Sequence, residues 1–261
     1  MRAWLLLASV GLGACAMPSG HLGAARRSSL RLDTESSARV RHASMLGTPP
    51  AASTAPMAVA SRLAPALLVL LHTAAHADEL EQRLVECARQ AERQVNASHF
   101  GERAPTREEC GEELSVDGCD EPITRAMLLG RQKHALALAC AREVLTQLWP
   151  APFSLEQRYR FYRSSRILET ISRDKEAQLV SQRCTHELRG SIKPDIVLHA
   201  PGNVLQGLLT LDFKFPCPPS NPPLWTRYGQ TSPYAGSTQG QIYREALGGE
   251  VLLLSPRGIS E

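Results

Sequence analysis

Lysine is scarce in this chain, so each lysine is informative. The 261 residues include 29 Lys and Arg, of which only four are lysine, and arginine is therefore the usual cation. A lysine inside a β-strand then indicates a need for a compact ammonium group whose pKa can be tuned. Excess positive charge is also missing from most of the chain: residues 1–77 carry +5, whereas residues 78–261 carry −2. This balance counts against avid nucleic-acid binding by a uniformly basic domain.

Two further absences exclude other classes of site. There is no CxxC pair and no paired His–Cys spacing, which argues against the usual structural zinc sites. The apolar run from Leu63 to Leu71 is too short for a membrane-spanning helix. What the chain does have is 43% hydrophobic residues, enough for one medium-sized domain with a real core and extensions around it.

The first 20 residues have the pattern of an export signal. Arg2 precedes an apolar run over residues 3–12. The run ends in Leu12-Gly13-Ala14-Cys15, which resembles the lipobox of bacterial lipoproteins. That resemblance implies a lipid on Cys15 and attachment to a membrane through it. Ordinary signal-peptide cleavage beside this motif is the alternative.

A second export signal covers residues 57–77, where Ala75-His76-Ala77 has the A-x-A pattern that signal peptidase prefers. Either translation begins at Met57, or residues 21–77 form a disordered tether behind a lipid anchor. Residues 16–56 are rich in Ser, Ala, Arg and Pro, a composition typical of unfolded segments. Both alternatives predict that residues 78–261 work outside the cytoplasm, in the cell envelope or secreted.

Six cysteines remain besides Cys15, and an even number in an exported chain predicts up to three disulfides. Spacing alone leaves their connectivity open. We expect a small closed loop, a link between two helices and a tie between outer strands, which would pair Cys110–Cys119, Cys87–Cys140 and Cys184–Cys217.

Hydrophobic periodicity divides the exported part into a helical, cysteine-containing region, residues 78–150, and an α/β domain, residues 151–261. Apolar residues at spacings of three and four predict helices over 78–99 and 122–148. His134 is expected on a solvated face of the second helix, with no partner for a catalytic role. The remaining elements are a stapled loop with a short helical turn over 104–121, a helix over 154–180 capped by Ser154, a strand over 184–188, a long proline-rich loop over 216–236, a helix over 237–247 and a strand over 250–255.

Residues 190–217 contain a predicted β-hairpin. Two apolar runs, Ile196–Leu198 and Leu208–Phe215, flank a turn with Pro201, Gly202 and Asn203. In this register Asp195 lies opposite Asp212, and alternation along the strand puts Lys214 on the same face as Asp212. Two carboxylates and an ammonium on one sheet face are costly unless they bind something, and a hard divalent cation fits them best.

Pro194-Asp195, a hairpin and then Asp212-Phe213-Lys214 resemble the PD-(D/E)xK nuclease superfamily. The resemblance implies an α/β fold: a restriction-endonuclease-like αβββαβ core with a mixed sheet, preceded here by the disulfide-braced helical region. It also implies that Asp195 and Asp212 hold Mg²⁺ or Mn²⁺ and that Lys214 orients the attacking water. Gln239-Gly-Gln-Ile-Tyr243 fits the QxxxY helix motif of the RecB-like branch, which implies that Gln239 and Tyr243 support the site or contact substrate.

A helix before the sheet often adds a third acid to the site in this superfamily. Glu169 is the candidate and Glu187 the competitor, and for each a solvated surface carboxylate is an equal alternative. His199 is expected to pack or to bond near the hairpin turn rather than to act as a base.

The resemblance implies an exported metal-dependent nuclease that hydrolyses phosphodiester bonds in DNA or RNA. Export signals ahead of a nuclease-like module are also similar to bacterial polymorphic toxins, which implies a cognate immunity protein as a partner. Two alternatives stay open. One is a nuclease that scavenges environmental nucleic acid. The other is a non-catalytic envelope lipoprotein, in which the Asp–Lys motif is a surface pair on an edge strand.

Overall fold

The structure is a computed structural model, and every residue that it describes belongs to one compact unit, residues 56–261. The described residues are 62–63, 71, 74–101, 103–116, 122–181 and 186–261. The first export signal, Cys15, most of the second signal, Cys119 and Cys184 therefore lie outside the described residues. Among the described residues, no helix combines the length and the apolar character that crossing a bilayer requires.

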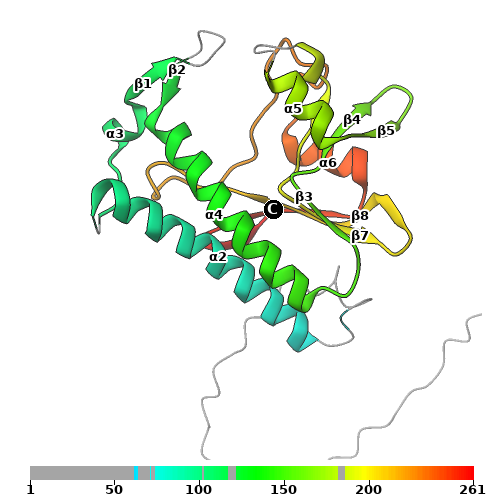
Figure 1. Cartoon of the computed structure of the whole chain (residues 1–261), viewed down its shortest axis with the longest axis horizontal. Coiled ribbons are helices and arrows are strands. Elements are labelled where there is room, and N and C mark those ends of the chain that lie inside the picture. Colours follow the sequence, from blue (N-terminus) through cyan, green and yellow to red (C-terminus); the bar gives the residue numbers. More distant parts are fainter. Residues whose placement is uncertain (1–61, 64–70, 72–73, 102, 117–121, 182–185) are drawn as a thin grey trace, which may run out of the picture. The chain divides into compact units, whose positions relative to one another are not determined.

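Two long helices, α2 (Ala74–Phe100) and α4 (Arg125–Leu148), pack side by side, as Figure 1 shows. Both predicted helices are thus confirmed. Helix α4 begins after Thr124, whose hydroxyl accepts a hydrogen bond from the Met127 N–H, the usual role of an N-cap threonine. The Cys87–Cys140 disulfide links the two helices, as expected from the sequence.

A short segment joins the two helices. It contains α3 (Arg107–Gly111), β1 (Glu113–Val116) and β2 (Pro122–Thr124). Helix α3 is the predicted helical turn, and Thr106 and Glu109 form a capping box at its start. Strands β1 and β2 pair antiparallel.

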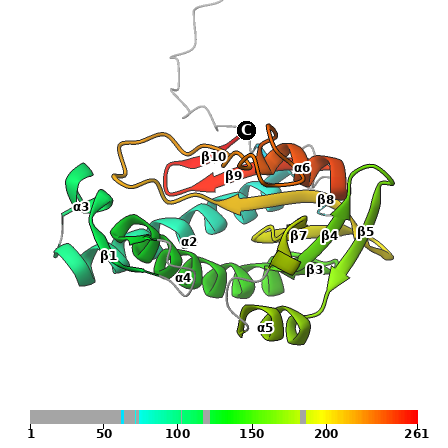
Figure 2. The same ribbon diagram turned by 90° about the horizontal axis from the view of Figure 1, so that it is seen from above.

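A five-stranded mixed sheet lies against the long helices (Figure 2). Strand β8 runs parallel to β9, and the other neighbours are antiparallel. In the order in which they lie in the sheet, the strands are β10 (Gly258–Ser260), β9 (Glu250–Ser255), β8 (Asn203–Phe213), β7 (Ile196–Ala200) and β3 (Phe153–Leu155).

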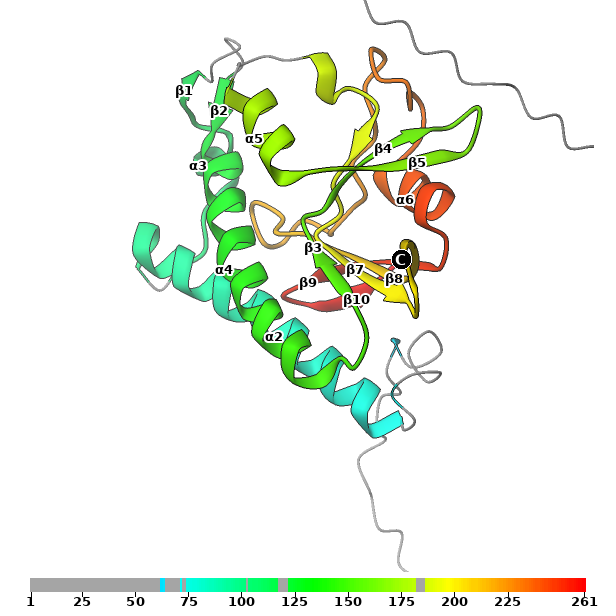
Figure 3. The ribbon, with the colours of Figure 1, turned by 45° about the vertical axis from the view of Figure 1, so that its right-hand side comes forward.

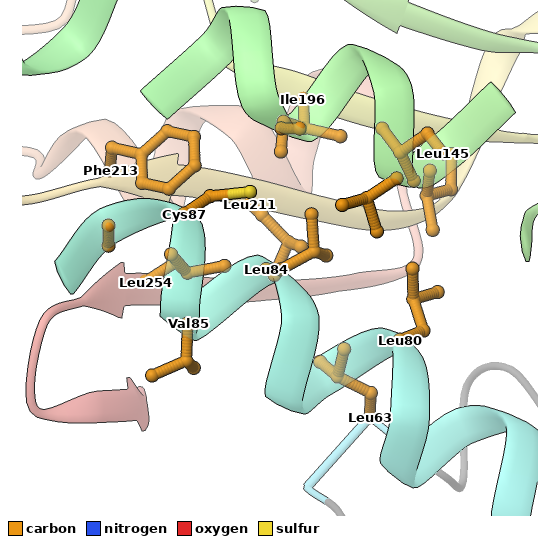
Figure 4. Packing of buried hydrophobic residues seen from close by; sticks show 14 of the residues in the cluster. Leu63, Leu80, Leu84, Val85, Cys87, Leu145, Ile196, Leu211, Phe213 and Leu254 are labelled. Carbon is orange, nitrogen blue, oxygen red and sulfur yellow. The ribbon is translucent and has the colours of Figure 1, made fainter. Parts of the chain in front are cut away.

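One hydrophobic core joins the helices to this sheet (Figure 4). Leu84 of α2 and Leu145 of α4 meet Leu211 of β8 and Leu254 of β9 in it, and all four are fully buried. Burial of this apolar surface is the main favourable term in folding, so the helical region and the sheet stabilise each other.

The β7–β8 hairpin is formed as predicted. Ile196 pairs with Leu211 and Leu198 with Leu209. Gly202 lies in the turn at φ +75°, a left-handed conformation that glycine adopts without strain. Strand β7 is buried from Ile196 to His199, which explains its nearly continuous apolar sequence.

The predicted helix over 154–180 is wrong. These residues form part of β3, then β4 (Arg158–Tyr162), β5 (Ile167–Ile171) and α5 (Arg173–Ser181). Along β4, Tyr159 and Phe161 are buried, and the residues on either side of each are more exposed. This burial period of two is typical of a strand, but the apolar residues of the segment also fit the spacing of three and four that predicts a helix. Arg166 turns the chain between β4 and β5 at φ +56°.

Two smaller corrections follow from the same region. Ser154 is not a helix cap but part of β3. Residues 186–188, expected at the end of a strand, form the 3₁₀ helix η1 (His186–Leu188). The next strand, β6 (Ser191–Ile192), joins β4 and β5 in a three-stranded sheet, which Figure 3 shows above the main sheet.

Helix α6 (Gln239–Leu247) packs between the two sheets and confirms the predicted helix. Thr238 caps it, and Gln241 completes a capping box. The loop before α6 is bound to the helical region by a disulfide between Cys110 and Cys217. The expected pairs Cys110–Cys119 and Cys184–Cys217 are therefore both wrong, because a contact between distant segments, not closeness in sequence, selects the partner.

Candidate functional site

The two aspartates of the predicted motif meet on adjacent strands. The pairing of Ile196 with Leu211 places the preceding residue, Asp195, opposite Asp212. Asp195 is 8% exposed and Asp212 is 4% exposed. An Asp195 carboxylate oxygen, Oδ2, accepts a 2.7 Å hydrogen bond from the Phe213 N–H, which fixes this side chain against β8. The hairpin therefore buries two carboxylates side by side.

Lys214 completes the predicted triad. Its ammonium Nζ lies 2.6 Å from Asp212 Oδ2 and donates to Gln239 Oε1 at 3.0 Å. The same nitrogen lies 5.7 Å from the centre of the Trp225 ring, within the range of a cation–π contact. The Lys214 backbone N–H donates to Leu254 O on β9, so the lysine is held at both ends.

Helix α6 brings Gln239 and Tyr243 to this triad, one helical turn apart on one face. The Tyr243 hydroxyl donates to Asp212 Oδ1 at 3.3 Å. Burial raises the pKa of Tyr243 well above its usual value, and the negative charge of Asp212 raises it further. The phenol therefore stays protonated and acts as a donor to the carboxylate.

His134 is the site residue that the sequence analysis missed. It comes from α4, and its Nδ1 lies 3.2 Å from Asp195 Oδ2. Its ring also packs edge-on against Phe215, with 5.3 Å between ring centres. The expectation of a solvated face without a partner is wrong. A signal was available: Ala137 and Leu138, three and four residues later, belong to the buried stripe of the helix.

The charged groups of the cluster shift one another's pKa values. Burial alone would lower the pKa of His134, but its hydrogen bond to Asp195 and the charge of that carboxylate outweigh burial and raise it. Burial and the neighbouring charge of Asp195 raise the pKa of Asp212 to about 6, although Lys214 opposes the shift. The two carboxylates thus repel each other and are balanced by the cations on either side.

The other acids that were candidates lie elsewhere. Glu169 is exposed on β5 in the three-stranded sheet, and no contact joins it to Asp195 or Asp212 among those that the described residues make. Glu187 lies in η1, where its backbone carbonyl accepts from Arg160. His199 bonds near the turn, as expected: its Nε2 lies 2.7 Å from Ser154 Oγ, and burial lowers its pKa.

Two cavities reach the cationic ends of the cluster, although Asp195 and Asp212 line neither of them. His134 lines a cavity of about 570 Å³ together with Arg131 and Glu156. Lys214 lines a second cavity of about 380 Å³ under the proline-rich loop. A ligand in either cavity would meet a cationic side chain of the cluster.

No family model, curated protein or solved structure matches this chain.

The cluster offers few protein ligands for a divalent metal ion. Within the described part of the chain, no group of three or more His, Cys, Asp or Glu side chains is arranged as a metal site. Asp195 and Asp212 nevertheless give two hard oxygen ligands, and Mg²⁺ is often held by one or two carboxylates while it keeps several waters. Burial, and then the neighbouring charge of Asp195, raise the pKa of Asp212, and a bound cation would oppose both effects.

Proposed function

We propose that this chain is an exported, metal-dependent nuclease that hydrolyses phosphodiester bonds in DNA or RNA. One observation carries the proposal: Asp195 and Asp212 lie opposite each other on a buried hairpin, and Lys214 contacts Asp212 at 2.6 Å. Mg²⁺ or Mn²⁺ bound there would stabilise the charge that builds up on the phosphate and lower the pKa of a bound water.

The protein side chains have separate tasks in this proposal. Asp195 and Asp212 hold the ion, and Lys214 orients the water on the same face. Gln239 holds the Lys214 ammonium and Tyr243 holds the Asp212 carboxylate, so both are positioning residues. His134 contacts Asp195 and helps to hold its carboxylate. Such partners of metal-binding carboxylates are typically worth 10- to 100-fold in affinity or activity.

The test uses the full chain with its disulfides oxidised, incubated with plasmid DNA and with total RNA, in Mg²⁺, Mn²⁺ or EDTA. Asp212→Ala and Lys214→Ala variants run beside it. Asp174→Ala and Lys175→Ala, which remove the same side chains from the exposed start of α5, are the matched controls. We expect metal-dependent degradation that both site variants lose and both controls keep. Folded protein that degrades neither polymer with either metal would refute the proposal.

A non-catalytic envelope protein is the second candidate, and one observation favours it. Each carboxylate already has a cationic partner, since His134 contacts Asp195 and Lys214 contacts Asp212. A self-neutralised cluster of this kind needs no metal. In that case Lys214→Ala lowers only stability, and neither DNA nor RNA is cut by the parent.

Two disulfides among the described residues are typical of a chain in an oxidising compartment outside the cytoplasm. A lipid on Cys15, release from the cell, a role as an antibacterial toxin and a cognate immunity protein are all parts of the proposal. The toxin role predicts that export of the parent into a bacterial periplasm slows growth and that Lys214→Ala does not. A scavenging nuclease would need no immunity protein and would leave growth unchanged.

A further inference from the structure

A further cavity, of about 560 Å³, lies beside the three-stranded sheet and is lined by no residue of the Asp195–Asp212 cluster. Three arginines line it, together with two tyrosines and backbone from three segments. Its lining is Arg160, Phe161, Tyr162, Arg163, Ser164, Arg189, Gly190, Pro233 and Tyr234. A volume of this size is typical of small-molecule and cofactor sites.

Two of the three arginines, Arg160 and Arg189, have N–H groups that donate to no described residue. The Arg160 guanidinium donates to the Glu187 carbonyl, which leaves most of its five N–H groups for another acceptor. Arg189 is exposed and makes no hydrogen bond or ion pair with any other described residue. Arg163, in contrast, is held by Glu245 through two contacts of 2.7 Å. The cavity therefore presents an excess of positive charge.

The walls of the cavity are fixed. Tyr234 is buried, and its hydroxyl lies 2.7 Å from the carbonyl oxygens of both Phe161 and Gly190. On β4, Arg160 and Tyr162 point to the same side, because side chains alternate along a strand and Phe161 between them is buried. Tyr162 is 43% exposed and lines the same cavity as Arg160, so a flat ligand can stack on its ring.

The cavity and the carboxylate cluster lie on different faces of helix α6. On the cavity side, the ring of Tyr234 lies 5.1 Å from that of Tyr228. Helix α6 also separates the two sites, since Tyr243 faces Asp212 and Glu245, two residues later, turns about 200° away to hold Arg163.

From this geometry we infer that Arg160, Arg189 and Tyr162 form a binding site for one nucleotide of a single-stranded nucleic acid, with its phosphate on the arginines and its base on the tyrosine. The inference rests on the proposed nuclease function. Planar guanidinium groups match phosphate geometry, and bases stack on exposed aromatic rings without a need for base pairing.

The test measures binding without hydrolysis. The full chain, oxidised and in EDTA, is titrated against a fluorescein-labelled oligothymidylate by anisotropy at several salt concentrations. The test variants are Arg160→Gln/Arg189→Gln, the single variant Arg189→Gln and Tyr162→Ala. The control, Arg107→Gln/Arg142→Gln, removes the same charge from exposed positions on α3 and α4.

We expect the Arg160/Arg189 variant to bind about 10- to 100-fold more weakly and its salt slope to become less steep by about 0.7, because one phosphate of a single strand is no longer neutralised. Arg189→Gln, which disturbs no described contact, should reduce the slope by less than the double variant does. Tyr162→Ala should weaken binding about 10-fold with an unchanged slope, since stacking releases no counterions. The control variant should keep the parent slope.

Three results would overturn the inference. The first is a slope and an affinity of the arginine variants that match those of the control. The second is duplex DNA that binds as tightly as the single strand and is insensitive to Tyr162→Ala. The third is arginine-dependent binding of inorganic phosphate without binding of the oligonucleotide, which would make the cavity a site for free phosphate. Hydrolysis in Mg²⁺ is scored separately, so arginine-dependent binding without hydrolysis would refute the nuclease and leave this site standing.

Discussion

The imidazole Nδ1 of His134, on helix α4, lies 3.2 Å from Oδ2 of Asp195, the residue directly before strand β7. This contact ties the helical region directly to the carboxylate cluster. It gives helix α4 a part in the site as well as in the core, because the depth at which α4 packs on the sheet sets the distance from the imidazole to the carboxylate.

His134→Ala should weaken metal binding, because Asp195 loses one of the two partners at its Oδ2 and keeps only the Phe213 N–H. We expect the Mn²⁺ concentration that gives half-maximal hydrolysis to rise about 10- to 100-fold, with a smaller effect on the rate at saturating metal. His99→Ala on the exposed end of α2 is the control and should match the parent. A metal titration that is unchanged in His134→Ala would show that the imidazole has no such role.

Stability without metal should depend on the ionisation of Asp212. Its pKa is about 6 in the folded chain against 3.8 for a free side chain, so the folded state binds the proton more tightly. The contribution to stability is full below pH 3.8 and is lost as the pH rises through about 6. A shift of roughly two units corresponds to about 3 kcal/mol.

Urea unfolding in EDTA from pH 4 to pH 8 measures this effect as the difference between the parent and Asp212→Asn. The parent should lose stability relative to the variant as the pH rises, and added Mg²⁺ should reverse the loss at pH 8 if the ion binds the carboxylates. A difference that is constant with pH would mean that Asp212 is ionised throughout the range.

The two disulfides should have different effects on hydrolysis. Cys217 lies three residues after Lys214, so the Cys110–Cys217 bond restrains the loop that leads away from the site. Cys110→Ser/Cys217→Ser should lower both the melting temperature and the rate of hydrolysis at 25 °C. Cys87→Ser/Cys140→Ser, which frees only the two helices, should cost a comparable few kcal/mol of stability and leave that rate within about twofold. Equal losses of rate in both variants would contradict the local role of Cys217.

Gly249 should tolerate no side chain. It has φ +64°, and a Cβ there would lie 2.4 Å from the Gly207 carbonyl oxygen, between β8 and β9. Gly249→Ala should destabilise the fold by more than about 3 kcal/mol, because alanine is strained at this positive φ and its Cβ would clash with the Gly207 carbonyl oxygen. Gly130→Ala on α4 meets open space and should stabilise the helix by about 0.5–1 kcal/mol. Thermal melts of the two variants provide the comparison, and a stable Gly249→Ala would refute the close approach.

Local sequence patterns were enough to predict part of the fold. The helices α2, α4 and α6 follow from apolar spacing and caps, and the β7–β8 hairpin follows from two apolar runs around a glycine turn. The same hairpin register brought Asp195, Asp212 and Lys214 together, since alternation along a strand is a property of the chain itself. The segment 154–180 was misjudged because short amphipathic strands with aromatic residues also fit a helical spacing.

The sequence by itself therefore determined the elements whose periodicity is unambiguous and the pair of carboxylates that one hairpin aligns. Tertiary structure alone decided that His134 meets Asp195, that Cys110 bonds to Cys217 and that Arg160 and Arg189 share a cavity. Each of these contacts joins segments that are far apart in the chain. Such contacts depend on how helices and sheets pack their buried faces, and packing leaves no spacing signal in a single sequence.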